Sequence, residues 1–191
     1  MGKNRLEAFS DGVIAIIITI MVLELKVPHG DQLSELVAML PVMLSYVLSF
    51  IYVGIYWNNH HHLFHVARHV DGAVMWGNLH LLFWLSIVPF VTNWMGEHYD
   101  SAWPVALYGV VLMMSGTAYY ILTQALISLH GRDSAIAKAL GSDVKGKLSV
   151  VIYLVAIGLA FVETWLSLVL YAAVAMIWIV PDRRIERVLQ E

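Results

Sequence analysis

The sequence contains no cysteine and few charged residues. Of its 191 residues, 13% are Asp, Glu, Lys or Arg, whereas 60% are hydrophobic. The absence of cysteine excludes disulfides, thiolate metal sites and a cysteine nucleophile. A soluble domain is typically about a quarter charged. So few charges cannot cover a water-facing surface, and we therefore expect lipid to be the solvent for much of the chain.

Several functional motifs are also missing. The net charge of −3 gives no basic excess for binding nucleic acid. The sequence has no G-x-S-x-G motif, no glycine-rich phosphate loop and no H-E-x-x-H zinc motif. It has no close pair of acids inside its apolar runs either. We therefore expect neither an enzyme nor a protein that holds a cofactor or a metal ion.

Long charge-free runs indicate helices that cross a membrane. The runs 36–57, 72–96 and 101–129 each reach the roughly 20 residues that a spanning helix needs. Runs 148–162 and 164–181 are shorter, and only Glu163 separates them, which predicts a tight hairpin of two helices. The fold class predicted is therefore all-α: a single polytopic membrane domain, 1–191, with six transmembrane helices at approximately 6–27, 35–58, 71–95, 103–129, 146–163 and 164–181.

The first of these helices is the least apolar. Its charge-free run, 12–23, is short, so a spanning helix must include Ser10, Asp11 and Glu24 near its ends. A helix tolerates such residues at membrane depth when it faces protein or water instead of lipid. This helix is therefore the best candidate for lining a polar path.

Lys and Arg predict the orientation of the chain. With six spans, one side of the membrane holds ten of the eleven basic residues and the other holds only Lys26. The positive-inside rule then places both termini in the cytoplasm. The ten are Lys3, Arg5, Arg68, Arg132, Lys138, Lys145, Lys147, Arg183, Arg184 and Arg187.

The N-terminus carries the most specific motif. It reads R-x-x-x-F-S-D from Arg5 to Asp11 and opens an apolar helix. This pattern resembles the signature of the lysosomal potassium channel transmembrane protein 175 and its bacterial relatives. Further residues match the second and third helices of that family. They are Trp57, Asn59, His60 and His61, followed by Trp76, Asn78, Pro89, Phe90 and Thr92.

A physical reason for the signature follows from its place in the helix. Asp11 lies close to hydrocarbon, so it must be paired or hydrogen-bonded. Ser10 can bond to a neighbouring helix, and Phe9 can wedge between helices. We interpret the signature as a packing clasp that holds the first helix, completed at the same membrane face by Arg5, Asn59, His60, His61 and Asn78.

The predicted pore face lies on the same first helix. Ile16, Thr19, Ile20 and Leu23 are spaced i, i+3, i+4, i+7 and so share one side of it. The family resemblance implies a homotetramer in the cell membrane in which this face lines a central pore for K⁺. Rings of Ile and Leu can close such a pore by dewetting, and four Thr19 hydroxyls can form a polar layer. No T-V-G-Y-G-type loop is present, so a filter of backbone carbonyls is not expected.

Two other functions are less consistent with the sequence. A haem- or metal-binding redox protein needs paired histidines on facing helices within the bilayer. Five histidines do lie between His60 and His69, but only His80 lies well inside a span, where we expect a structural hydrogen bond. A secondary transporter is usually marked by inverted repeats and charged residues at the midplane, and neither is evident.

Overall fold

The computed structural model describes residues 2–131, 134, 137 and 143–179. Over these residues the fold is all-helical. The helices are α1 (Lys3–Leu23), α2 (Leu33–Ala38), α3 (Leu40–Val66), α4 (Gly72–Glu97), α5 (Ala102–His130), α7 (Val144–Leu159) and α8 (Thr164–Ile179). Of the basic residues used for orientation, Arg132, Lys138, Arg183, Arg184 and Arg187 lie outside the described residues, as does the end of the predicted span 164–181.

The first helix differs from its predicted extent of 6–27. It begins at Lys3 and ends at Leu23, after which irregular chain leads to α2. Pro28 explains the earlier end, because the ring of a proline disfavours the helical conformation at the residue before it. Because α1 begins at Lys3, Ser10 and Asp11 lie about two turns inside it and not at its edge.

The predicted span 35–58 is divided into two helices. The short α2 ends at Ala38, and α3 begins at Leu40 with Pro41 in its first turn, where a proline is tolerated because its N–H would have no partner. At the other end α3 continues to Val66. The histidine run was predicted to lie in a loop from residue 58, and this is wrong: His60, His61, His62 and His65 are helical, since neither Gly nor Pro interrupts them.

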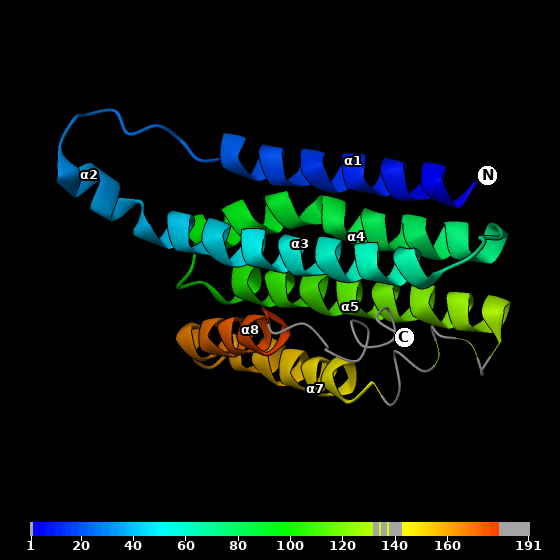
Figure 1. Cartoon of the computed structure of the whole chain (residues 1–191). Coiled ribbons are helices and arrows are strands. Elements are labelled where there is room, and N and C mark those ends of the chain that lie inside the picture. Colours follow the sequence, from blue (N-terminus) through cyan, green and yellow to red (C-terminus); the bar gives the residue numbers. More distant parts are fainter. Residues whose placement is uncertain (1, 132–133, 135–136, 138–142, 180–191) are drawn as a thin grey trace.

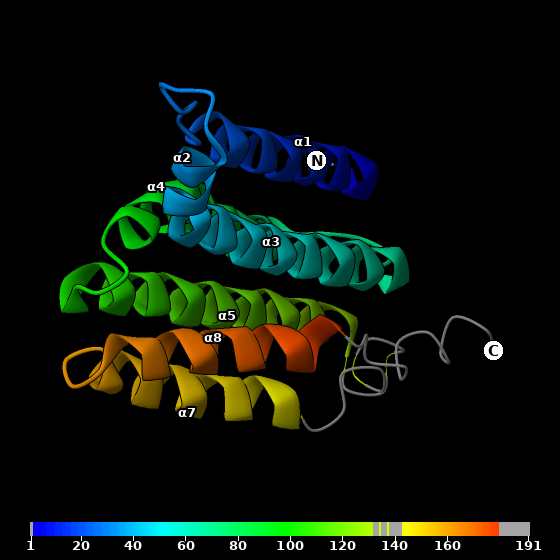
Figure 2. The same ribbon diagram turned by 90° about the vertical axis from the view of Figure 1, so that its left-hand side faces the viewer.

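The helices are stacked in layers with α4 near the centre (Figure 1). Helix α4 packs against α1, α3 and α5, and the α7–α8 hairpin packs against α5. Figure 2 shows α1 at one margin of the stack and α7 at the other. Because α1 is at the margin, only one of its sides is covered by its own chain.

Four of the described helices are long and apolar enough to cross a membrane: α1, α3, α4 and α5. Helices α7 and α8 have 16 described residues each. At 1.5 Å per residue, 16 residues extend about 24 Å, less than the roughly 30 Å of hydrocarbon in a typical bilayer. Helix α7 ends early because the chain turns back through Ala160–Glu163, where the Glu163 amide still donates to Leu159 O at 2.8 Å.

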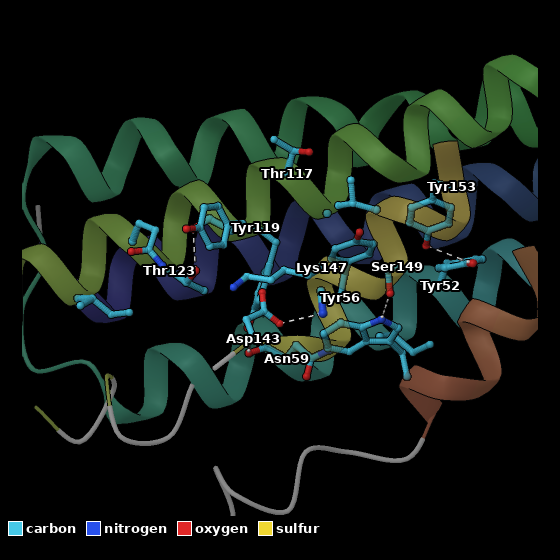
Figure 3. Close-up of a pocket in the computed structure, with 18 residues that line it drawn as sticks. Tyr52, Tyr56, Asn59, Thr117, Tyr119, Thr123, Asp143, Lys147, Ser149 and Tyr153 are labelled. Atoms are coloured by element: carbon cyan, nitrogen blue, oxygen red, sulfur yellow. Dashed lines mark hydrogen bonds between the residues drawn. The ribbon is translucent and has the colours of Figure 1, made fainter. Parts of the chain in front are cut away.

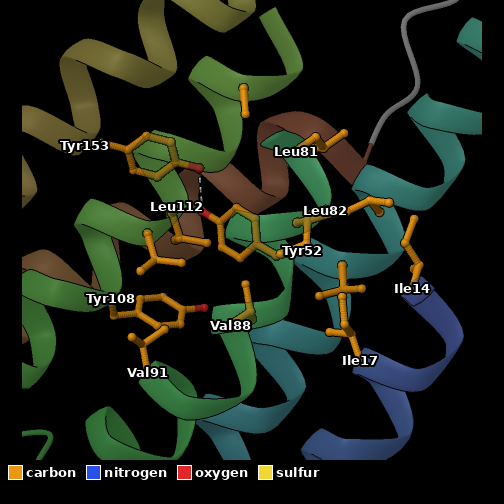
Figure 4. Close-up of a cluster of buried hydrophobic side chains, with 14 of the residues drawn as sticks. Ile14, Ile17, Tyr52, Leu81, Leu82, Val88, Val91, Tyr108, Leu112 and Tyr153 are labelled. Carbon is orange, nitrogen blue, oxygen red and sulfur yellow. Dashed lines mark hydrogen bonds between the residues drawn. The ribbon is translucent and has the colours of Figure 1, made fainter. Parts of the chain in front are cut away.

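Buried hydroxyl groups connect the central helices. Thr92 Oγ1 of α4 lies 2.7 Å from Ser49 Oγ of α3, which lies 2.9 Å from the Tyr108 hydroxyl of α5. The Tyr52 hydroxyl donates to Tyr171 O at 2.6 Å. It also accepts from the Tyr153 hydroxyl at 3.3 Å, the bond drawn in Figure 4. Helices in lipid gain little from the hydrophobic effect, so such bonds and close packing set their arrangement.

Gly109 provides a test of this packing. A Cβ at Gly109 would overlap the Tyr171 hydroxyl, which donates to Val105 O at 3.1 Å, and would lie 2.9 Å from Ile157 Cγ1. We predict that Gly109→Ala lowers the free energy of unfolding by about 1–3 kcal/mol through overpacking. The measurement is the thermal unfolding midpoint in detergent. Gly54→Ala is the control, because its Cβ meets nothing within 4 Å, and an equal loss in both variants would contradict the packing argument.

Candidate ion pathway and signature network

Helix α1 has one buried and one open side. Its buried residues face α3 and α4, and Figure 4 shows two of them, Ile14 and Ile17, directed at the core. All four predicted pore residues lie on the open side: Ile16 is 57% exposed, Ile20 41% and Leu23 80%, and Thr19 is also exposed. An aliphatic stripe this exposed must meet lipid or another protein chain in a membrane.

Thr19 is the polar member of this stripe. Its hydroxyl donates to Ile16 O at 2.8 Å, one turn back along the helix. This bond uses the only hydroxyl proton, so the oxygen keeps both lone pairs as acceptors. Thr19 can therefore accept a hydrogen bond from water or coordinate a cation, but it cannot at the same time donate to a ligand.

A groove beside the stripe was not predicted from the sequence. It has a volume of 660 Å³ and lies between α1 and the second half of α4. Ile16 and Ile20 form one wall, and Pro89 and Phe90 form the other. Glu24 and Glu97 lie at one end of the groove, and Glu97 also binds Lys26, with Nζ and Oε1 2.5 Å apart. That carboxylate raises the pKa of Lys26 above its usual value.

Three signature-related residues form a buried chain of hydrogen bonds. Asn78 of α4 donates from Nδ2 to Ser10 Oγ of α1 at 2.9 Å, and its Oδ1 lies 2.8 Å from Nε2 of His60 in α3. Because Oδ1 can only accept, His60 must carry its proton on Nε2. The Ser10 hydroxyl in turn donates to Leu6 O at 2.9 Å. All three side chains are fully buried, so the chain joins three helices inside the protein.

Other members of the predicted clasp lie nearer the surface. Asp11 accepts a hydrogen bond from Trp57 Nε1 at 3.1 Å, and Glu7 lies 3.4 Å from His61 Nδ1. The sequence analysis did not assign Glu7 a role. Arg5 and Phe9 are both exposed and have no polar partner within the described residues. Phe9 therefore does not wedge between helices of its own chain.

Asn59 does not join the predicted clasp. Its carbonyl accepts from the Tyr119 hydroxyl at 3.3 Å, and its side chain lines a pocket toward α5 and α7. A helix places residues 59 and 60 about 100° apart, so they face different neighbours. His80 accepts from Trp84 Nε1 at 3.0 Å, which confirms the expected structural bond.

The histidine run is not arranged as a metal site. The described ranges contain no group of three or more His, Cys, Asp or Glu side chains that could hold an ion. His61 stacks on Trp57 with ring centres 6.2 Å apart. His130, at the end of α5, accepts from the Arg68 amide at 3.0 Å and so ties the α3–α4 loop to α5. Sequence spacing gave no signal for that contact.

Comparison with known proteins decides the family. Residues 5–89 match the model of the endosomal/lysosomal potassium channel TMEM175. A potassium channel of Chryseobacterium sp. (strain P1-3) is 51% identical over 191 residues, which is 100% of both chains. The chain belongs to the TMEM175 family. A second family member, a potassium channel of Streptomyces collinus, is 35% identical over 91% of this chain and 90% of its own.

The fold agrees with that of a solved TMEM175 homologue. The crystal structure of a lysosomal potassium-selective channel TMEM175 homolog from Chamaesiphon minutus superposes with a TM-score of 0.81. It is 30% identical and covers 94% of this chain and 97% of its own. The human endosomal/lysosomal proton channel TMEM175 is 38% identical, but over only 44% of this chain and 19% of its own length. The protein is thus a membrane protein of the TMEM175 family.

The buried chain of hydrogen bonds gives a stability prediction. Asn78→Ala leaves His60 Nε2 without a partner and takes away the bond that links Ser10 to α4, so we expect the free energy of unfolding to fall by about 1–3 kcal/mol. Thermal unfolding in detergent measures it. Asn93→Ala is the matched control on the same helix, because Asn93 is only partly buried and forms no side-chain hydrogen bond. Equal stability of the two variants would show that the bonds contribute nothing net.

Proposed function

We propose that four copies of this chain form a passive potassium-selective channel in the cell membrane, with the open side of α1 lining the pore. One observation carries the proposal: Ile16, Thr19, Ile20 and Leu23 lie together on the side of α1 that its own chain leaves uncovered. The relatives that match nearly the whole chain are named potassium channels, and we therefore assign K⁺ as the conducted ion. K⁺ then acts as the permeant ion and no cofactor is needed.

Potassium is favoured over protons by the extent of the matches. The vertebrate relatives named proton channels match less of this chain, 44% in the human protein. The bacterial relatives named potassium channels match 100% and 91%. These relatives are named channels, and none is named a redox protein or a transporter. The redox and transporter alternatives are therefore set aside.

The pore we propose is narrow and largely aliphatic. Four-fold symmetry repeats each residue around one axis, so Ile16, Ile20 and Leu23 each form a ring. Rings of this kind hold back water and ions by dewetting, without a charged gate. The Thr19 ring presents oxygen acceptors between them, because its proton is engaged by the Ile16 carbonyl. A partly dehydrated cation can exchange water for these oxygens.

The proposal includes a six-span topology with both termini in the cytoplasm. Helices α1, α3, α4 and α5 supply four spans, and the α7–α8 hairpin supplies two shorter ones. Lys3, Arg68, Lys145 and Lys147 then share one side of the membrane, which is the cytoplasmic side by the positive-inside rule.

Flux into liposomes tests the function directly. Purified protein in liposomes that hold a K⁺ gradient should carry K⁺ without an energy source, and its mass in detergent should equal four chains. A pH-sensitive dye in the same vesicles reports protons separately. Proton flux in the absence of K⁺ flux would overturn the potassium assignment, and a monomeric mass would overturn the tetramer.

The polar layer gives the next prediction. Thr19→Ala should reduce the K⁺-over-Na⁺ permeability ratio roughly three- to tenfold, which corresponds to the loss of about one net hydrogen bond per ion. The reversal potential under bi-ionic conditions measures this ratio. Thr19→Ser keeps the hydroxyl and should keep the ratio, whereas Thr117→Ala on α5 is the control away from the pore. An unchanged reversal potential in Thr19→Ala removes this residue from selectivity.

The aliphatic rings give a prediction of opposite sign. Ile16→Ala and Leu23→Ala should raise single-channel conductance several-fold, because a wider and less apolar ring lowers the dewetting barrier. Planar bilayer recordings measure it. Leu154→Ala on α7 is the control, because Leu154 is 56% exposed, similar to Ile16, but lies at the other margin of the bundle. Conductance that stays at the wild-type level in both α1 variants refutes hydrophobic gating at these positions.

A further inference from the structure

A second cavity lies on the far side of the bundle from α1. It has a volume of 390 Å³ and is enclosed by α3, α5, α7 and the end of α8 (Figure 3). This volume is within the range of pockets that hold small molecules, about 300–1,000 Å³. Its residues belong neither to the pore stripe nor, apart from Asn59 and Lys147, to the residues that the sequence analysis singled out.

The cavity changes in character along its length. Tyr52 and Tyr153 lie toward one end, whereas Asn59, Asp143 and Lys147 gather toward the other (Figure 3). The polar end is the one nearer the beginning of α7, on the side of the molecule that carries Lys3 and Arg68. Aromatic side chains, Tyr119 and Trp178 among them, line the cavity, and its charged groups lie away from Tyr52 and Tyr153. Such a cavity fits a molecule with one apolar and one polar end.

Three side chains of the lining that can donate hydrogen bonds have no partner within the described ranges. The Tyr56 hydroxyl, the Asn59 side-chain amide and the Lys147 ammonium line the cavity, and none has a hydrogen-bond partner among the described residues. The carboxylate at this end, Asp143, already accepts from the Gly146 amide at 2.9 Å as the cap of α7. Free donors beside a cation favour a ligand head that is an anionic acceptor.

The wall is fixed by bonds that do not need a ligand. Trp178 of α8 donates from Nε1 to Ser149 Oγ at 2.9 Å, and the Lys145 ammonium lies 5.9 Å from the centre of its ring. Tyr119 donates to Asn59 O and meets Tyr56 edge-on, with ring centres 6.3 Å apart. The cavity is therefore preformed, which lowers the ordering cost of binding.

We propose that this cavity binds a single-chain amphiphile with an anionic head, such as a long-chain carboxylate from the bilayer. The head accepts hydrogen bonds from Lys147, Asn59 and Tyr56, and the first part of the chain lies against Tyr52 and Tyr153. The site is separate from the proposed ion path, since the cavity shares no residue with the pore stripe or its groove.

Photolabelling of the full-length protein in detergent tests the site. The probe is a palmitate that carries a diazirine, and the labelled residues are identified by mass spectrometry. Label is expected on α3, α5 and α7 residues of the cavity wall, competed by palmitate and not by hexadecanol, which has the same chain and no charge. Label spread over the lipid-facing surface, or equal competition by the alcohol, would overturn the proposal.

Variants separate occupation of the cavity from general lipid contact. Gly116 lies in the wall, where an added Cβ would lie 3.5 Å from the Tyr56 hydroxyl, an ordinary contact. Gly116→Leu should fill the cavity and reduce labelling about fivefold or more, and Gly116→Ala should reduce it less. Gly158→Leu on the open side of α7 is the control, because its Cβ meets nothing within 4 Å.

A substitution at Lys147 tests the contact with the head of the ligand and leaves the core unchanged. It is exposed, so Lys147→Gln should fold normally and weaken half-saturation by palmitate roughly tenfold through loss of a charge-assisted hydrogen bond. Wild-type labelling in both Gly116→Leu and Lys147→Gln would overturn the site. Because K⁺ flux is measured on the same purified variants after reconstitution into liposomes, a failure of channel function and a failure of this binding site are seen separately.

Discussion

The attachment of α1 by only one of its sides is the constraint on which the rest of the structure depends. Asn78 joins Ser10 to His60 inside the protein, and Ile14 and Ile17 pack beside them. These contacts fix the rotation of α1. With that rotation set, the residues on the opposite side of the helix must turn outward, so the stripe from Ile16 to Leu23 faces away from its own bundle. In a membrane, such a helix at the margin is available to line a path shared by several subunits.

Hydrogen bonds between buried hydroxyl groups favour one arrangement of the helices in this protein. The hydroxyls of Ser49, Thr92 and Tyr108 meet at the centre of α3, α4 and α5. Tyr52 and Tyr171 join α3 to α8, and Tyr171 reaches back to α5 through Val105 O. Each such group would be costly in hydrocarbon without its partner, so the bonds favour one arrangement of the helices over others.

The two margins of the bundle present different side chains. At the α1 margin the exposed stripe is aliphatic except for the Thr19 hydroxyl. In the proposed pore, this oxygen replaces part of the water around the ion. At the α7 margin the side chains enclose a space with aromatic walls and a charged end. None of the residues that line the cavity belongs to α1, so a ligand in the cavity does not touch the stripe.

The sequence by itself determined the membrane character, the family and the stripe on α1, because these depend on composition and on spacing along one helix. It also placed Ser10, His60 and Asn78 in one network. Only the tertiary structure decided which neighbours complete it. Asn59, adjacent to His60, faces α5 and α7 instead, whereas Trp57 bonds to Asp11 and Glu7 lies beside His61. The cavity is enclosed by four helices, α3, α5, α7 and α8, which come from different parts of the chain. No spacing rule predicts it, because its shape depends on how closely helices approach and where small residues such as Gly116 leave room.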